Sequence, residues 1–291
     1  MDFAQLTCIF FQRSTVAVLL SAACRHDDAR CDQAQRSNRT LTQIAPAAGY
    51  HGAMKHFLAA ALYSLLVAAV IPAASAQSVP DTMARRTMAC TGCHGEQGRA
   101  TSDGYYPRIA GKPAGYLYNQ LVNFREGRRT YPMMVYMVGN LSDDYLREMA
   151  AYFSGLHPPY PAPQPLRVAA ATLKRGRQLA QEGDKGNKVP ACVACHGAAL
   201  TGVAPAVPGL IGLPRDYLSG QFGAWKNGTR HAASPDCMAE LAGRLSVEDI
   251  SAVSAWLSLQ PAPADPLPQA MATKALPLEC GSTRQAQEGP R

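Results

Sequence analysis

The chain has 291 residues, of which 47% are hydrophobic and 17% charged, with 24 Gly and 22 Pro. This composition is typical of a globular protein and excludes a disordered chain and a disulfide miniprotein. A net charge of +7 ordinarily suggests nucleic acid or an acidic membrane surface as a partner, but the nine Cys are more specific.

Residues 54–76 have the pattern of a secretory signal peptide. A basic start at Lys55 precedes an apolar run over residues 57–71, and Ala74-Ser75-Ala76 forms a small-x-small cleavage site. The alternative is an uncleaved N-terminal anchor. We therefore expect a mature chain that is exported to the periplasm.

The mature chain is expected to begin near Gln77. Because a signal peptide normally starts a chain, we interpret residues 1–53 as an upstream extension that is not native or is disordered. The exported compartment is oxidising, so each mature Cys should be paired, ligated or derivatised. From Gln77 onward, 22 Lys and Arg against 17 Asp and Glu leave a charge of +5.

Two copies of the pattern C-x-x-C-H follow, CTGCH at 90–94 and CVACH at 192–196. This pattern is the attachment signature of c-type haem, in which two thiols on one helical turn form thioethers and the adjacent His binds iron. A thioredoxin-like pair would follow a strand of a βαβ unit, and roughly 100 intervening residues disfavour one zinc site. The sequence predicts two covalently bound haem c groups, held by Cys90, Cys93, Cys192 and Cys195 with His94 and His196 on the irons.

The motifs belong to a longer internal repeat. At an offset of 101 residues, the matched pairs include Pro107 and Pro208, Gln120 and Gln221, and Arg129 and Arg230. The offset changes only where loops are expected. We predict two homologous domains at 77–156 and 166–260, a Pro-rich linker at 157–165 and a Pro-rich tail at 261–291.

Each copy predicts three helices. The first leads to the haem motif, over about 81–92 in one copy and 167–182 in the other. The second begins near Pro113 or Pro214 and ends at Gly127 or Gly228, and the third begins after the N-caps Ser142 or Ser246. No segment alternates with a period of two. The expected fold class is all-α, with two tandem domains of three main helices wrapped round a covalent haem.

A six-coordinate electron carrier needs a second axial ligand, and Met thioether raises the reduction potential. The first copy offers Met133, Met134, Met137 and Met149. Met134 is favoured because it lies seven residues before Leu141, as Met238, the single Met of the second copy, lies seven before Leu245. Core packing is the alternative role for any one Met.

Other polar positions have simpler expected roles. Pro107 and Pro208 lie about a dozen residues after the ligand His, and their carbonyl oxygens are expected to accept the second imidazole N–H. His157 and His231 are interpreted as surface residues. Cys237 and Cys280 remain as a pair, which suggests a disulfide in an oxidising compartment.

Over about residues 80–258 the chain resembles the tandem diheme class I cytochromes c of the cytochrome c4 type. The segments CTGCHG, PRIAG, YLYNQLVNFREGRR and LSDDYLREMAAYF carry the resemblance in the first copy, with CVACHG, PGLIG, YLSGQFGAWKNGTR and LSVEDISAVSAWL in the second. It implies two lobes with His94/Met134 and His196/Met238 ligation. It also implies a periplasmic shuttle between donor and acceptor proteins, such as a periplasmic dehydrogenase and a respiratory oxidase.

Because both irons are expected to be saturated by protein ligands, the sequence predicts an electron-transfer protein and not an enzyme; a diheme peroxidase would lack one Met. The alternative is a cytochrome subunit or dedicated acceptor of a periplasmic dehydrogenase, associated with the membrane only through its partner. Two haems add four propionates and bring the charge to about +1, so no nucleic-acid partner is expected. Arg129 and Arg230 are candidates to compensate these propionates, or else lie at solvated helix ends.

Overall fold

Helices form nearly all of the regular structure in the computed structural model, which describes residues 79–270 and 276–283. The expected signal peptide at 54–76 and the extension at 1–53 lie outside these residues. None of the described helices is long and apolar enough to cross a membrane.

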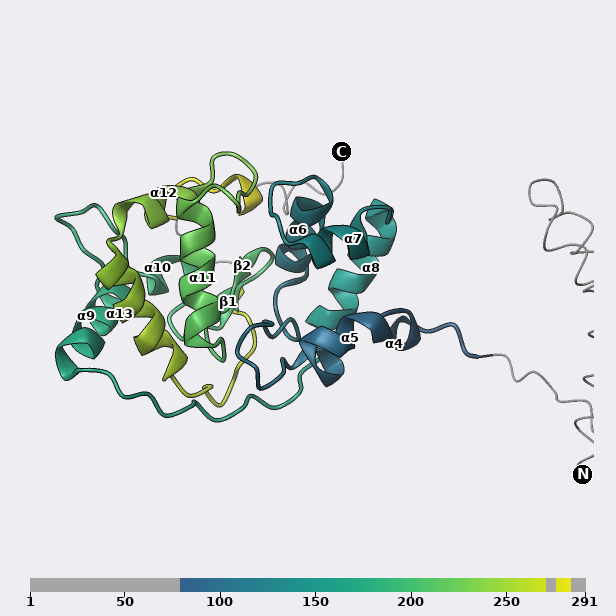
Figure 1. Ribbon diagram of the computed structural model, residues 1–291, viewed down its shortest axis with the longest axis horizontal. Helices are drawn as coiled ribbons and strands as arrows, with labels where there is room; N and C mark the ends of the chain where they lie inside the picture. Colours follow the sequence, from purple (N-terminus) through teal and green to yellow (C-terminus); the bar gives the residue numbers. More distant parts are fainter. Residues whose placement is uncertain (1–78, 271–275, 284–291) are drawn as a thin grey trace, which may run out of the picture. The chain divides into compact units, whose positions relative to one another are not determined.

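Two groups of helices follow one another along the chain (Figure 1). The first group, here called lobe 1, comprises α4 (Met83–Arg86), α5 (Met88–His94), the 3-10 turn η1 (Glu96–Gly98), α6 (Ala114–Arg125), α7 (Pro132–Val138) and α8 (Asp143–Ser154). The second group, lobe 2, comprises α9 (Ala170–Gln181), α10 (Val193–His196), α11 (Arg215–Lys226), α12 (Cys237–Arg244) and α13 (Val247–Ser258).

The N-caps of α8 and α13 are the serines that the sequence predicts. Ser142 Oγ accepts a hydrogen bond from the Tyr145 N–H at 3.3 Å, and Ser246 Oγ accepts one from the Asp249 N–H at 3.1 Å. These bonds satisfy N–H groups that have no partner within a first helical turn. Pro113 precedes α6 as its N-cap, one position earlier than the N1 site where Pro is most common.

Three local predictions are corrected by the structure. The first helix is broken at Thr87 into α4 and α5, because Thr87 leaves helical geometry. The segments around Met134 and Met238 form α7 and α12, which are not among the three helices predicted for each copy. Asp236 caps α12 by accepting from the Ala239 N–H at 3.1 Å, a signal that the sequence carries.

A minimal strand pair is the exception to the all-helical expectation within the described ranges. β1 (Gly202–Val203) and β2 (Val207–Pro208) pair antiparallel, with Gly202 opposite Pro208. Gln269 of the Pro-rich tail joins them, because its N–H donates to the Gly202 carbonyl and its carbonyl accepts from the Ala204 N–H. The tail is therefore anchored on lobe 2.

The core of lobe 2 depends on a close helix crossing. Helices α9 and α13 lie against each other (Figure 1) and bury Leu179 and Leu257 in one cluster. At Gly176 of α9, an added Cβ would lie 2.1 Å from the Ala252 carbonyl oxygen of α13. The absence of a side chain at Gly176 therefore sets the separation of these two helices. In lobe 1, α6 packs against α8 around Leu146.

The described residues after Gln77 form one compact unit in which the lobes make backbone contacts. Arg129 and Arg230 pair in an antiparallel bridge, flanked by hydrogen bonds from the Thr130 N–H to the Thr229 carbonyl at 2.9 Å and from the His231 N–H to the Arg128 carbonyl at 2.6 Å. Equivalent positions of the two repeats thus meet each other, as in an isologous dimer interface.

The linker is also held against lobe 1. The Arg108 guanidinium, almost fully buried, donates to the Pro158 and Pro159 carbonyls and stacks on the Tyr160 ring at 3.8 Å. Tyr160 in turn fills the space over Gly212 of lobe 2, where an added Cβ would lie 2.4 Å from the ring. A segment that the sequence describes only as a stiff spacer therefore contributes to the lobe interface.

We expect Gly176→Ala to lower the free energy of unfolding by about 1–3 kcal/mol, because its Cβ overlaps the backbone of α13. Gly243→Ala, on the exposed side of α12 with nothing near its Cβ, should raise it by about 0.5–1 kcal/mol through helix propensity. Chemical denaturation of both variants measures these changes. Equal stabilisation by both would contradict the close packing of α9 and α13.

Candidate functional site

Each C-x-x-C-H motif ends a short helix, so that the final His is presented at the helix terminus. His94 ends α5 and His196 ends α10, and both side chains are buried. The next residue is Gly in each copy, with φ of 74° at Gly95 and 85° at Gly197. At Gly95 an added Cβ would lie 2.4 Å from the Ala100 carbonyl oxygen, so the sharp turn requires Gly.

The two His side chains have the same hydrogen-bond geometry. His94 Nδ1 lies 2.9 Å from the Pro107 carbonyl oxygen, and His196 Nδ1 lies 2.8 Å from the Pro208 carbonyl oxygen. Since a carbonyl only accepts, Nδ1 carries the proton and Nε2 keeps its lone pair. Burial lowers the pKa of both imidazoles. The neutral form with a free Nε2 is the form that binds a metal.

All the site residues expected from the sequence line one cavity of about 860 Å³. They are Cys90, Cys93, His94, Pro107, Met134, Cys192, Cys195, His196, Pro208, Met238, Cys237 and Cys280. The four motif Cys form no disulfide. Burial raises the pKa of the Cys192 thiol to about 12, and it also raises the pKa of Cys90 and Cys195. Such thiols are poor thiolate nucleophiles, unlike those of a thioredoxin-like pair.

Helices α7 and α12 carry the candidate Met ligands. Met134 and Met238 lie in the first turn of their helices, half-buried, with both facing the cavity. Met133 is 54% exposed, and Met149 is buried in the core of lobe 1. All four of these candidates of the first copy line the cavity, with Met137 one helical turn beyond Met134, so the choice of Met134 depends on the repeat register.

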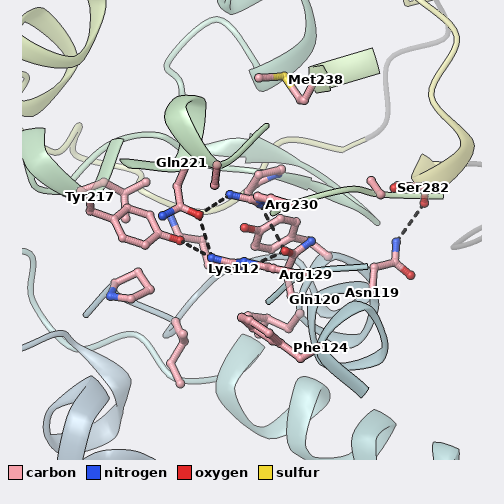
Figure 2. A pocket seen from close by; sticks show the side chains of 18 of the residues that line it. Lys112, Asn119, Gln120, Phe124, Arg129, Tyr217, Gln221, Arg230, Met238 and Ser282 are labelled. Carbon is pink, nitrogen blue, oxygen red and sulfur yellow. Dashed lines mark hydrogen bonds between the residues drawn. The ribbon is translucent and has the colours of Figure 1, made fainter. Parts of the chain in front are cut away.

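Two arginines and two glutamines form a pseudo-symmetric network at the lobe interface (Figure 2). Arg129 donates to Gln120 of its own lobe at 2.9 Å and to Gln221 of lobe 2 at 2.8 Å. Arg230 donates to Gln221 of its own lobe at 2.6 Å and to Gln120 of lobe 1 at 3.2 Å. Each Gln oxygen therefore accepts from both guanidinium groups.

This network concentrates positive charge without a carboxylate. Arg230 is 5% exposed, which excludes a solvated helix end for it. Burial and the neighbouring Arg129 lower the pKa of Arg230, and neither guanidinium forms an ion pair within the part of the chain that the structure describes. Arg129 is half-buried, and its charge beside the buried charge of Arg230 is costly unless an anion lies near them.

A further unpaired donor faces the cavity. Trp225 Nε1 is buried with no hydrogen-bond partner, and the Arg230 guanidinium stacks on the Trp225 ring at 3.9 Å. A haem fits this donor set, because its vinyl groups match paired thiols, its iron matches imidazole and thioether, and its carboxylates match buried cations and an N–H donor. The residues present therefore fit covalent haem c.

The tail crosses from the second Met helix to lobe 1. Cys237 and Cys280, the expected pair, are joined by a disulfide with a Cα–Cα distance of 5.1 Å. The Gly281 N–H donates to the Pro235 carbonyl at 2.9 Å, and Asn119 Nδ2 of α6 donates to the Ser282 carbonyl at 3.0 Å (Figure 2). Residues 276–283 therefore cover the cavity on the side of Met238.

Sequence reasoning missed some residues at the cavity. Lys112 of lobe 1 reaches the Gly209 carbonyl of lobe 2, and the Asn119 contact ties the tail to α6. Both are contacts between distant segments, so no local pattern signals them. His157 and His231 are exposed, as expected.

Comparison with known proteins gives consistent relatives, although no family model matches the chain. The chain is 36% identical over 209 residues to the thiosulfate dehydrogenase electron acceptor of Thiomonas intermedia, covering 72% of this chain and 92% of the relative. It is 32% identical over 173 residues to cytochrome c4 of Pseudomonas aeruginosa, covering 58% of this chain and 82% of the relative.

Solved structures agree with these sequences. The thiosulfate dehydrogenase TsdBA of Marichromatium purpuratum superposes with a TM-score of 0.56 at 34% identity, over 63% of this chain and 40% of that chain. Reduced cytochrome c4 of Pseudomonas stutzeri superposes with a TM-score of 0.51 at 28% identity, over 60% of this chain and 95% of that chain.

Because the disulfide closes a long loop, we expect Cys237→Ser combined with Cys280→Ser to lower the free energy of unfolding by about 2–4 kcal/mol. The exported, unreduced wild-type protein should react with no maleimide under denaturing conditions, since thioethers and a disulfide occupy its mature Cys. Mass spectrometry counts the labels. Two labelled thiols would show that this pair is not bonded.

Proposed function

The chain belongs to the family of tandem diheme cytochromes c that includes cytochrome c4 and the thiosulfate dehydrogenase electron acceptor, and from this we propose that it holds two haem c groups and relays single electrons between periplasmic proteins. Membership of this family implies covalent haem c and electron transfer. We propose further that the protein holds two haems, that it is periplasmic and that it has no enzymatic activity.

The duplicated His geometry is the observation that carries the proposal. Two C-x-x-C-H motifs each present a buried His whose Nδ1–H is held by a Pro carbonyl, beside a shared cavity. Cys90, Cys93, His94 and Met134 would hold the first haem, and Cys192, Cys195, His196 and Met238 the second. With four protein ligand atoms on two irons, no position is left for a substrate.

The chain's own residues perform the tasks that a relay requires. When bound, haem c supplies an iron that alternates between the ferrous and ferric states. The Pro107 and Pro208 carbonyls fix the imidazole orientation and keep the proton on Nδ1, so that the ligand set is the same in both states. Arg129 and Arg230 would compensate the carboxylates of bound haems, and the same residues bond across the lobe interface.

The names of two relatives favour one type of electron donor. Both are described as thiosulfate dehydrogenase electron acceptors, from Thiomonas intermedia and Stutzerimonas stutzeri. We propose a periplasmic thiosulfate dehydrogenase as the donor and a respiratory oxidase as the acceptor. A dedicated acceptor that stays bound to its dehydrogenase is the second candidate, supported by the TsdBA structure.

Mass spectrometry of the exported protein is expected to give the polypeptide from about Gln77 plus two haems. Cys192→Ser combined with Cys195→Ser should remove one haem. The native ferrous protein should not bind carbon monoxide, because both irons are saturated. A bare polypeptide mass, or ready binding of carbon monoxide, would overturn the diheme relay.

The Met ligands are tested by single substitutions. Met134→Ala and Met238→Ala should each remove about half of the Met-to-ferric-iron absorption band and open one iron to carbon monoxide. Met137→Ala is the matched control, since Met137 lines the same cavity one turn away from Met134. If Met137→Ala opens an iron and Met134→Ala does not, the register assignment is wrong.

The donor is tested by rapid mixing. A thiosulfate dehydrogenase supplied with thiosulfate should reduce the ferric protein within the turnover time of the dehydrogenase, while thiosulfate alone should not reduce it. Oxidation of thiosulfate by this chain without the dehydrogenase would instead assign it an enzymatic activity.

A further inference from the structure

Lys112 is a buried charged residue that the proposed relay has not used. It lies in lobe 1, just before α6, and is 4% exposed. Its Nζ crosses the lobe interface and donates to the Gly209 carbonyl oxygen of lobe 2 at 2.5 Å. Burial and the neighbouring charge of Arg108 together lower the pKa of Lys112 to about 7. No carboxylate among the described residues compensates its charge.

The position of this ammonium group relates it to the second haem site. Gly209 follows Pro208, whose carbonyl oxygen holds His196 Nδ1. Lys112 lines the same cavity as His196, and Figure 2 shows it near Gln221 and Tyr217 of lobe 2. A residue of lobe 1 therefore places a positive charge beside the expected iron ligand of lobe 2.

The other repeat has no equivalent of this contact. At the offset of 101 residues, Lys112 corresponds to Leu213, a buried apolar residue of lobe 2. The Arg129 and Arg230 pair bonds to both lobes, and Arg129 also lies close enough to His94 to lower the pKa of that imidazole. Lys112 is a further positive charge, which lobe 1 directs toward the second site.

A fixed positive charge near an iron favours the ferrous state, because that state carries one positive charge less. The effect is larger in a buried site, where solvent screens the charge weakly. We propose that Lys112 is a cross-lobe positioning residue that raises the reduction potential of the second haem relative to the first. This inference rests on the diheme relay proposed above. It adds that, in the singly reduced protein, Lys112 favours the electron on the second haem.

The test compares the exported wild-type holoprotein with four variants by spectroelectrochemical titration at about pH 6, below the pKa of Lys112. Lys112→Met keeps the length of the side chain without the charge. It should lower the second potential enough to change the distribution of one electron between the haems about tenfold, or 59 mV for a one-electron couple. The first potential should stay unchanged. Lys112→Arg should restore most of the difference.

Lys226→Met is the matched control for a general loss of charge. Lys226 Nζ also donates only to backbone carbonyls of lobe 2, those of Ala242 and Leu245, but it lies outside the cavity lining. This variant should leave the difference between the two potentials unchanged. Met238→His, which lowers the potential of the second haem alone, identifies its wave.

Three results would overturn the proposal: no change in Lys112→Met, an equal change in both potentials, or a change in Lys112→Arg as large as in Lys112→Met. The last would show that Lys112 acts only by joining the lobes. Mass spectrometry of the same samples counts the haems, so a failure of the diheme relay is recognised separately from a failure of the role of Lys112.

Discussion

The burial of positive charge at the lobe interface is the constraint on which the structure depends. Arg129 and Arg230 lie in one hydrogen-bonded network, pair through their backbones, and have no ion pair in the described part of the chain. Such an arrangement is unfavourable for a bare polypeptide, because the charge of Arg230 is removed from water beside the half-buried charge of Arg129. The carboxylates of a bound haem would compensate these charges, and haem binding would then be coupled to the association of the lobes.

Equivalent residues of the two repeats contact each other at the lobe interface. Gln120 and Gln221 each accept from both arginines, as the two halves of an isologous interface would. Because the two halves are parts of one chain, their sequences can differ, unlike those of two identical subunits. Lys112, which corresponds to Leu213 in the repeat, and the disulfide-bonded tail have no equivalent in the other half, and both line the cavity.

Electron transfer requires ligands that do not move when the charge of the iron changes. The structure provides this by backbone contacts that do not depend on side-chain flexibility. The carbonyls of Pro107 and Pro208 hold the imidazoles, and Gly95 and Gly197 allow the turn that follows each His. The fold is shared with cytochrome c4.

The amino-acid sequence by itself determined the helical fold class, the internal repeat, the haem motifs, the His and Pro pairs, and the leftover Cys pair. These are local patterns or matches at a constant offset, so spacing is sufficient to find them. Only the tertiary structure decided that Arg129 meets Arg230, that Lys112 reaches Gly209, and that Asn119 holds the tail. These contacts join segments about 100 residues or more apart, and their energy comes from burial and charge, which depend on packing and not on neighbours in the chain.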